Sequence, residues 1–286
     1  MFADTEYHLK CVQPAILCTQ AALKMDPLPR MFVQFSTAQV YEPHSKPAVE
    51  SAKIKPWTVL ARAHHAAEDR VMDAAEKGLT VCILRPATVY GPGDVNGLSP
   101  RLCVASTYQK TGETMKLLWT KELKTNTVHV VDVCRAVQHV CTYPRDSAMR
   151  IFNLADSGDT DQGKSNAIIE SLFHIKTGFA GSIMSNLAKL NFKDVCQDAN
   201  EGHYPVWMSL LRDSGISNSP LTTYISQELL YNNHLSVDGT AITSVGAGAG
   251  QPFAYTHPRI TVELVREQLA YAINQGVFPR VSVDGL

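Results

Sequence analysis

The chain has 286 residues, 45% of them hydrophobic, which is enough for one large domain or two modest ones. Its net charge is −1, its pI is about 6.8, and its lysines and arginines are scattered. The chain as a whole therefore has no electrostatic footprint for nucleic acid or for an anionic membrane.

Cysteine usage and the amino terminus bear on the cellular compartment. The seven cysteines, none in a Cys-x-x-Cys pair, are Cys11, Cys18, Cys82, Cys103, Cys134, Cys141 and Cys196. This odd, unclustered set argues against disulfides and zinc, and predicts small buried side chains in a reducing compartment. No run of about 18 apolar residues could span a membrane. The polar, acidic amino terminus resembles neither a signal peptide nor a transit peptide, so we expect a cytoplasmic protein.

The first half of the chain alternates helical and strand patterns. Apolar spacing predicts a helix over residues 9–24. Apolar, β-rich runs that predict buried strands occur at residues 31–35, 79–84 and 150–154. A helix rich in Ala, Glu and Arg is predicted over residues 57–77, and Gly78 should close it. This order of strands and helices predicts an α/β fold with a parallel sheet.

Fewer helices and strands are predicted in the rest of the chain. Strand patterns at residues 115–119 and 127–131 precede a helix from Asp132 to about residue 143, with Asp132 as its N-cap. Beyond residue 156 strands become rare and helical patterns alternate with long polar loops. These later helices are predicted at about residues 163–173, 181–190 and 261–274.

Three segments carry a family resemblance: Phe35-Ser-Thr-Ala-Gln-Val-Tyr41, Leu84-Arg-Pro-Ala-Thr-Val-Tyr-Gly-Pro-Gly-Asp94 and Val128-His-Val-Val-Asp132. In this order they resemble motifs of the extended short-chain dehydrogenases/reductases, the NAD-dependent epimerase/dehydratase family. The second segment is the most specific. A fourth, Val237-Asp-Gly-Thr240, resembles the family's last helix entry, with Ala241 in place of the usual lysine.

The resemblance implies a partial Rossmann-type parallel sheet with a helix-rich substrate-side portion. We assign residues 1–156 to the remainder of the NAD(P)-binding domain, with interleaved substrate-side segments, and 157–286 to the helix-rich portion. The family's opening strand and Gly-rich turn, which cradle the cofactor pyrophosphate, have no counterpart before Phe35. The glycine cluster Gly246–Gly250 follows no apolar strand and meets Pro252, so we predict a flexible loop there.

The family's catalytic residues are altered in this sequence. The resemblance places Thr37 at the Ser/Thr position that polarises the substrate oxygen. Anchoring on Glu68 puts His64 at the position of the family's lysine and Leu60 at that of its tyrosine. A leucine cannot transfer a proton, and a histidine is only partly charged at neutral pH. Thr37 and His64 are therefore the catalytic candidates.

Other residues near the strand ends offer alternatives for the proton transfer. Tyr41, Tyr90 or His65 would serve as a relocated general acid. We favour the alternative, in which the two tyrosines pack under the loops and the adjacent histidines lie on a helix surface.

Ligand-binding residues are expected where parallel strands end, because ligands of doubly wound sheets bind beyond the carboxyl ends of strands. The resemblance implies that the cofactor contacts Ser36, Pro86, Ala87, Thr88 and Val89. It places Tyr90 and Arg101 near the substrate, where a guanidinium can donate paired hydrogen bonds to two oxygens of a diphosphate. The alternative for Arg101 is a solvated arginine on the surface. His203, His234 and His257 have no metal-ligand spacing, so no metal is expected.

By resemblance, the protein uses NAD or NADP for hydride transfer at a secondary alcohol of a sugar-nucleotide or sterol-like small molecule, and a homodimer is compatible with it. One alternative is a non-catalytic binding or scaffold protein with a degenerate dehydrogenase fold. Another is a truncated gene product, because the strand at residues 31–35 would lack a neighbour on one side. Such exposed edges promote aggregation, so we expect poor stability in isolation.

Overall fold

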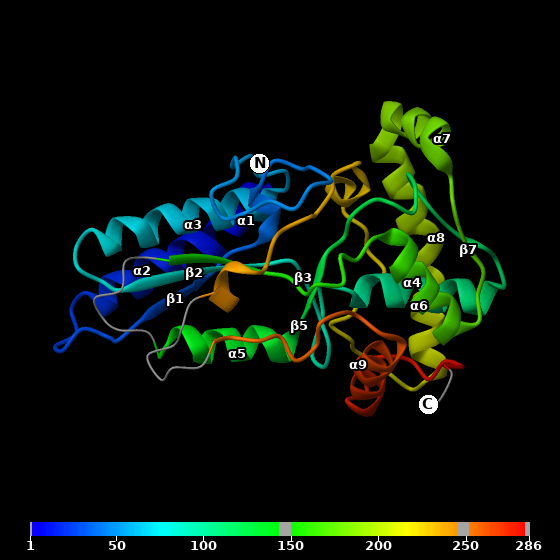
Figure 1. Ribbon diagram of the computed structural model, residues 1–286. Helices are drawn as coiled ribbons and strands as arrows, with labels where there is room; N and C mark the ends of the chain where they lie inside the picture. The colour runs from blue at the N-terminus through cyan, green and yellow to red at the C-terminus, as the bar shows by residue number, and fades with distance from the viewer. Residues whose placement is uncertain (1, 143–149, 245–251, 284–286) are drawn as a thin grey trace. The chain divides into compact units, whose positions relative to one another are not determined.

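The computed structural model describes residues 2–142, 150–244 and 252–283, and it divides the chain into two compact units (Figure 1). Unit 1 combines residues 1–87, 131–157 and 234–258. Unit 2 combines residues 88–130, 158–233 and 259–286. Each unit is thus assembled from three separate stretches of chain. The assignment of a boundary near residue 156 stays a prediction.

Unit 1 is built on a three-stranded parallel sheet in the order β1–β2–β6. The strands are β1 (Phe32–Phe35), β2 (Val81–Pro86) and β6 (Arg150–Leu154). The register places Phe35 beside Leu84 and Leu84 beside Phe152. Residues 81–85 of β2 are all buried, because this central strand has a strand on each edge and helices over both faces (Figure 1). The three predicted strands are confirmed, and β1 is an edge strand within the described residues.

Helices lie on both faces of this sheet. Figure 1 shows α2 (Gln13–Ala22) and α3 (Val59–Ala75) on one face and α5 (Val130–Val140) on the other. Shorter elements of unit 1 are α1 (Phe2–Tyr7), the π-helix η1 (His8–Val12) and the 3₁₀ helices η2 (Ala38–Val40) and η5 (Ala241–Ser244). The predicted helix over 9–24 is therefore present as η1 and α2.

Helix α3 begins and ends where the sequence indicates. Thr58 caps it, its Oγ accepting a hydrogen bond from the Ala61 backbone N at 3.0 Å. Gly78 follows the helix with a φ of 97°, a left-handed conformation that glycine adopts without steric cost. Alanines of α2 and α3 pack against each other around Val71, which lets the two helices approach closely.

The predicted N-cap role of Asp132 is wrong. Helix α5 begins at Val130, directly after a strand, so Asp132 lies in the first turn. Its fully buried carboxylate accepts hydrogen bonds from the backbone N of Thr256 and of His257, both at 2.8 Å, and from Arg135 Nη1 at 3.0 Å. Burial raises the pKa of Asp132, but these hydrogen bonds outweigh it and lower the pKa overall. Asp132 clamps a distant loop onto α5.

Unit 2 is mainly helical. Its strands form two parallel pairs, β3 (Thr88–Tyr90) with β5 (Thr127–His129), and β4 (Met115–Leu117) with β7 (Thr177–Phe179). Its helices are α4 (Ser99–Thr111), α6 (Gln162–Phe173), α7 (Gly181–Ala188), α8 (Phe192–Asp213) and α9 (Val262–Asn274), with 3₁₀ helices η3 (Lys189–Asn191) and η4 (Gln227–Leu230). One apolar cluster joins α4, α6, α8 and α9, and in it Trp207 meets Phe278 edge to face at 5.6 Å.

Two helices of unit 2 had no prediction, α4 and the 22-residue α8. Pro205 lies inside α8, and proline normally indicates a helix end because it has no N–H and clashes with the preceding turn. The three helices predicted beyond residue 156 are confirmed as α6, α7 and α9.

All seven cysteines are free, but their predicted burial is only partly correct. Cys82, Cys103 and Cys196 are buried, whereas Cys18, Cys134 and Cys141 are exposed. The predicted loop at Gly246–Gly250 lies outside the described residues. Across residues 2–142, 150–244 and 252–283, no helix is long and apolar enough to cross a membrane. The same ranges hold no cluster of three or more His, Cys, Asp or Glu side chains suited to a metal ion.

Candidate functional site

In unit 1, the carboxyl ends of β1 and β2 lie at one edge of the sheet, as predicted. The Ser36 backbone N, just after β1, donates to the Leu84 carbonyl of β2 at 2.8 Å. The Ala87 backbone N, just after Pro86, donates to the Leu154 carbonyl of β6 at 2.9 Å. Ser36 and Ala87 are buried and Pro86 is half-buried. Three of the five predicted cofactor contacts therefore share this edge.

Thr37 is held at the same edge by a local hydrogen bond. Its Oγ accepts from the Gln39 backbone N at 3.3 Å and so caps the short helix η2. The Gln39 side-chain oxygen in turn accepts from Thr58 Oγ at 2.9 Å, at the start of α3. Because the Thr37 hydroxyl acts only as an acceptor in these contacts, its proton can be donated to a ligand.

His64 lies on α3 with an unused acceptor. Leu60, His64 and Glu68 are spaced four residues apart and so share one face of the helix. His64 Nδ1 is buried and has no hydrogen-bond partner among the described residues. Burial lowers the pKa of His64, opposed in part by a hydrogen bond to the Phe35 backbone. The lowered pKa favours the uncharged imidazole at neutral pH, and in the tautomer with the proton on Nε2, Nδ1 presents a lone pair.

Glu68 of α3 and Arg85 of β2 form a buried ion pair. Arg85 Nε donates to Glu68 Oε1 at 2.9 Å, and Arg85 Nη2 donates to Glu68 Oε2 at 2.6 Å. Burial raises the pKa of Glu68, but Arg85 outweighs this and lowers the pKa overall. His65 also reaches this carboxylate, with its Nδ1 3.4 Å from Oε2. The pair ties α3 to β2 with the two-point geometry of arginine and carboxylate.

Tyr41 extends this network. Its hydroxyl accepts from Arg85 Nη1 at 2.8 Å and donates to Asn153 Oδ1, on β6, at 2.7 Å. The side chain is buried, and burial raises the pKa of Tyr41. Both functions of the hydroxyl are therefore occupied inside the fold. This favours the packing interpretation of Tyr41 over a relocated general acid.

The second half of the longest motif lies in unit 2. Thr88 and Val89 are half-buried on β3, and Tyr90 at its end is fully buried, edge to face with the His129 ring at 5.1 Å. Gly91 follows with a φ of 118°, and a Cβ at this position would lie 2.7 Å from His129 Nε2. Only glycine fits there, for reasons of both conformation and space.

Asp94 organises the loop that ends this motif. Its carboxylate accepts from the backbone N of Gly97 at 2.6 Å and of Ser99 at 2.8 Å. Gln268 of α9 donates to the same carboxylate at 2.9 Å and accepts from the Gly91 backbone N at 2.8 Å. These bonds fix the point where α4 begins, and they place Arg101 in its first turn.

Arg101 lines a mostly apolar pocket of about 230 Å³ within unit 2. Its Nη2 donates to Gln162 Oε1 at 3.0 Å, and the Gln162 amide is fixed by donating to the Leu118 carbonyl at 3.0 Å. No carboxylate pairs with Arg101 among the described residues. Burial lowers the pKa of Arg101 to about 10, so the guanidinium stays charged at neutral pH. A half-buried, unpaired cation of this kind suits an anionic ligand group.

Several pocket residues escaped prediction from sequence. Gln162, Trp119 and Tyr224 all line the Arg101 pocket. Gln162 is 61 residues from Arg101, and Trp119 has a φ of 72°, rare for a bulky residue. No local sequence pattern indicates the contact of Gln162 with Arg101 or the positive φ of Trp119. The large, amphipathic side chains of Trp119 and Tyr224 were the one feature of the sequence that could have suggested a binding pocket.

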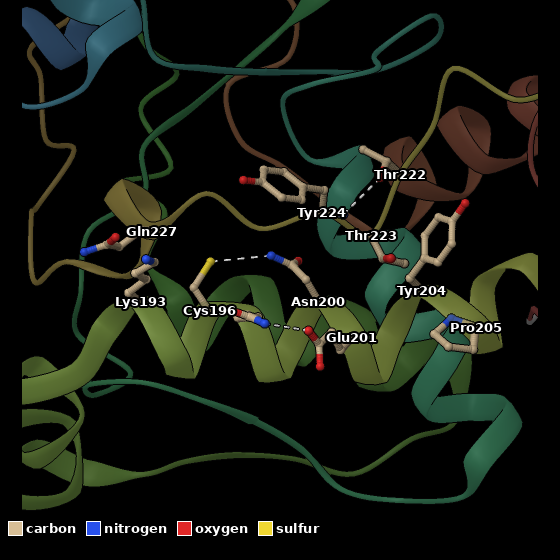
Figure 2. A pocket seen from close by; sticks show the side chains of 11 residues that line it. Lys193, Cys196, Asn200, Glu201, Tyr204, Pro205, Thr222, Thr223, Tyr224 and Gln227 are labelled. Carbon is tan, nitrogen blue, oxygen red and sulfur yellow. Dashed lines mark hydrogen bonds between the residues drawn. The ribbon is translucent and has the colours of Figure 1, made fainter. Parts of the chain in front are cut away.

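Unit 2 contains a second, larger pocket of about 630 Å³ along α8 (Figure 2). The Asn200 side chain holds the facing segment, since its Nδ2 donates to the Ile225 carbonyl at 3.0 Å and its Oδ1 accepts from the Ile225 N at 2.8 Å. Tyr224 lines this pocket and the Arg101 pocket alike. Pro205 also lines it, and having no N–H it leaves the Glu201 carbonyl without its helical donor.

The comparisons with known proteins agree with the motifs. Residues 16–155 match the model of the NAD dependent epimerase/dehydratase family. The predicted resemblance to this family is confirmed. A search of curated proteins finds no match. The matched range contains Thr37, His64, the Glu68–Arg85 pair and Arg101.

Solved structures of a sugar-nucleotide dehydratase, a sugar-nucleotide epimerase and MoeE5 share the fold. DesIV from Streptomyces venezuelae, a dTDP-glucose 4,6-dehydratase with NAD bound, has a TM-score of 0.62 at 17% identity, covering 96% of this chain and 69% of that one. UDP-glucuronic acid 4-epimerase from Bacillus cereus, in complex with UDP-glucuronic acid and NAD, has a TM-score of 0.58 at 11% identity, covering 92% and 67%. MoeE5, in complex with UDP-glucose and NAD, has a TM-score of 0.50 at 20% identity, covering 60% and 57%.

These likenesses confirm the predicted fold class, an α/β arrangement with a Rossmann-type parallel sheet. The match with MoeE5 covers 57% of the length of that protein.

Proposed function

We propose that this chain belongs to an NAD(P)-dependent oxidoreductase of the epimerase/dehydratase type, acting at a secondary alcohol of a sugar nucleotide. The observation that carries the proposal is Arg101, a half-buried guanidinium with no carboxylate partner among the described residues of its pocket. A diphosphate would satisfy it with paired hydrogen bonds. A sterol-like substrate would leave it desolvated and unpaired, which is costly, so a sugar nucleotide is favoured.

The family match and the NAD-bound structures support NAD or NADP as the cofactor. The residues at the strand ends fit the reactive end of such a group: Ser36, Thr37, Pro86 and Ala87 share one edge, and His64 has a buried nitrogen without a partner. Thr88 and Val89 continue the same segment into unit 2. When bound, the cofactor supplies the acceptor or donor of a hydride.

The chain's own residues would move the proton. Thr37 donates a hydrogen bond to the substrate oxygen, using the hydroxyl proton that its contact with Gln39 leaves available. His64 Nδ1 accepts the proton of the substrate hydroxyl as its carbon loses hydride and the carbonyl forms. The lowered pKa of His64 favours the neutral imidazole that this step needs. Leu60, at the family's tyrosine position, takes no part.

Leu60 supports one competing function, a non-catalytic binding or scaffold protein that keeps the fold. Such a protein would still bind a sugar nucleotide through Arg101 but would show no turnover, and replacing Thr37 with alanine would change nothing measurable. The location in the cytoplasm and the homodimer remain proposals. Seven free cysteines support a reducing compartment.

Binding of UDP-glucose tests the substrate class. The measurements are calorimetric titration and the shift of the melting temperature, for the wild-type chain, Arg101→Gln and Lys110→Gln. Lys110 is an exposed cation on the same helix, paired with Asp213, and serves as the matched control. We expect the wild type and K110Q to bind alike and R101Q to bind at least tenfold more weakly, since a hydrogen bond to a charged group contributes about 1.5–3 kcal/mol. Unchanged binding by R101Q would overturn the proposal.

A further inference from the structure

One wall of the Arg101 pocket belongs to a segment with little regular structure. We define this wall as residues 224–230, and four of its residues line the pocket: Tyr224, Ile225, Leu229 and Leu230. Residues 221–226 lie in no helix or strand, and the short 3₁₀ helix η4 follows them. The backbone N–H and C=O groups of such a segment need hydrogen-bond partners outside any regular ladder. The position of the wall therefore depends on side chains of other elements.

The side chain of Asn200, on α8, binds both polar backbone groups of Ile225. Its Nδ2 donates to the Ile225 carbonyl at 3.0 Å, and its Oδ1 accepts from the Ile225 backbone N at 2.8 Å. Because an amide carries a donor and an acceptor side by side, Asn200 pairs with this backbone much as a neighbouring strand would. Cys196 lies one turn earlier on α8, and its Sγ donates to the same carbonyl at 2.9 Å. Figure 2 shows Cys196 and Asn200 on the side of α8 that faces Tyr224.

The other end of the wall is held from inside the pocket. The ring nitrogen Nε1 of Trp119 donates to the Leu230 carbonyl at 2.8 Å, and Trp119 itself lines the Arg101 pocket. Asn200 differs from Trp119 in this respect, because it lines the larger α8 pocket and not the Arg101 pocket. Asn200 therefore acts on a ligand beside Arg101 through Ile225 rather than by direct contact.

We propose that Asn200 is a positioning residue for the substrate, because it fixes the wall against which a sugar nucleotide bound to Arg101 packs. This inference rests on the proposed function of the Arg101 pocket. Without the amide, the Ile225 N–H loses its partner and the carbonyl keeps only the Cys196 thiol, so the wall samples other positions. The apparent affinity for the substrate then falls by the fraction of molecules in which the wall is in place.

Calorimetric titration with UDP-glucose tests this role in Asn200→Ala. The matched control is Gln109→Ala, which also removes an amide bound to the backbone of unit 2. Gln109 Nε2 donates to the Phe173 carbonyl at 2.7 Å, and Gln109 lines neither pocket. We expect N200A to bind about tenfold more weakly than the wild type, as when the wall is in place in roughly one molecule in ten. Q109A should lose stability in urea unfolding but keep the wild-type affinity.

Asn200→Asp supplies a readout that a merely structural role would not move. At neutral pH the carboxylate of this variant faces the Ile225 carbonyl, and two acceptors repel each other. Once protonated, the acid has an O–H donor and a C=O acceptor, so it binds both groups of Ile225 again. Burial beside a carbonyl raises the pKa of an aspartate above its ordinary value of about 3.9. The affinity of N200D should therefore be about tenfold below that of the wild type at pH 7 and approach it near about pH 4.5, whereas N200A should show no such recovery.

The wild type at the same pH values is the control for every other group that titrates. The remaining titratable side chains around Asn200 are the same in all variants: Lys193, Cys196, Glu201, Tyr204 and Tyr224 in the α8 pocket, and Glu228 of η4, which packs against α8. The ratio of the N200D and wild-type affinities therefore isolates the titration at position 200. Circular dichroism at each pH would verify that each variant keeps the fold.

The failure of this role and the failure of the proposed function give different results. The positioning role would be overturned if N200A bound UDP-glucose as tightly as the wild type while R101Q did not. It would also be overturned if Q109A lost as much affinity as N200A, or if the affinity deficit of N200D were the same at pH 7 and at about pH 4.5. A wild type that does not bind UDP-glucose would instead overturn the proposed function, and this inference with it.

Discussion

The buried pair of Glu68 and Arg85 yields the sharpest prediction about stability. Both side chains are almost fully buried, 2% and 3% exposed, and two short hydrogen bonds join them. Glu68→Gln removes the negative charge and keeps the shape, which leaves the Arg85 cation uncompensated inside the fold. Breaking a buried pair in this way costs about 3–5 kcal/mol, a large part of the roughly 5–15 kcal/mol that stabilises a typical domain.

Urea unfolding followed by circular dichroism would measure this loss. The matched comparison is the double variant Glu68→Leu with Arg85→Met, which removes both charges and replaces them with apolar atoms. We expect its loss of stability to be smaller than the sum of the losses of Glu68→Leu and Arg85→Met measured singly, with a coupling energy of about 0.5–3 kcal/mol. A cost below about 1 kcal/mol for E68Q would refute the reasoning, because exposed pairs contribute that little.

The same pair gives stability a dependence on pH. The pKa of Glu68 is lowered in the folded chain from its ordinary value of 4.5. Its contribution is therefore fully present above pH 4.5 and is lost as the pH falls through the lower, folded pKa. In E68Q this acid-dependent loss should be smaller than in the wild type, and an unchanged acid limb would count against the assignment.

Three further predictions concern single residues. In urea unfolding, Gly91→Ala should lose about 1–2 kcal/mol of stability because of its positive φ, and about 1–3 kcal/mol more because of the clash with His129. Gly93 also has a positive φ but has free space around it, so Gly93→Ala should show only the first cost. Thr37→Ala should lower turnover of UDP-glucose about a hundredfold while leaving the affinity for it nearly unchanged. The pH profile of turnover should fall on the acid side with an apparent pKa below 6.5, since His64 must be neutral to accept the proton, and His64→Gln should abolish turnover rather than shift the profile.

The local elements of unit 1 could be predicted because each depends on neighbours in sequence. Apolar runs and spacing located β1, β2, β6 and α3, and the motif at Leu84–Asp94 indicated the family. The steric reason for Gly91 comes from the structure, because a Cβ there would meet the His129 side chain.

The features that escaped prediction depend on contacts between distant residues. Asp132 looks like a helix cap, yet its partners Thr256 and His257 come more than a hundred residues later. The Arg101 pocket requires Gln162 and Tyr224, which no local pattern brings together. Helix α8 was not predicted, and it contains Pro205, a residue that normally indicates a helix end. Burial of the apolar side of α8 in the core of unit 2 overrides that preference.

We propose that this chain binds a dinucleotide at the strand ends of unit 1 and uses it for hydride transfer. A thermal melt of the purified chain, alone and with saturating NAD or NADP, tests it most directly. A ligand at about 100 times its dissociation constant adds roughly 2.7 kcal/mol to the folded state. We expect one of the two nucleotides to raise the midpoint of a cooperative melt. A cooperative melt that neither nucleotide shifts would contradict the claim and would favour the binding or scaffold protein.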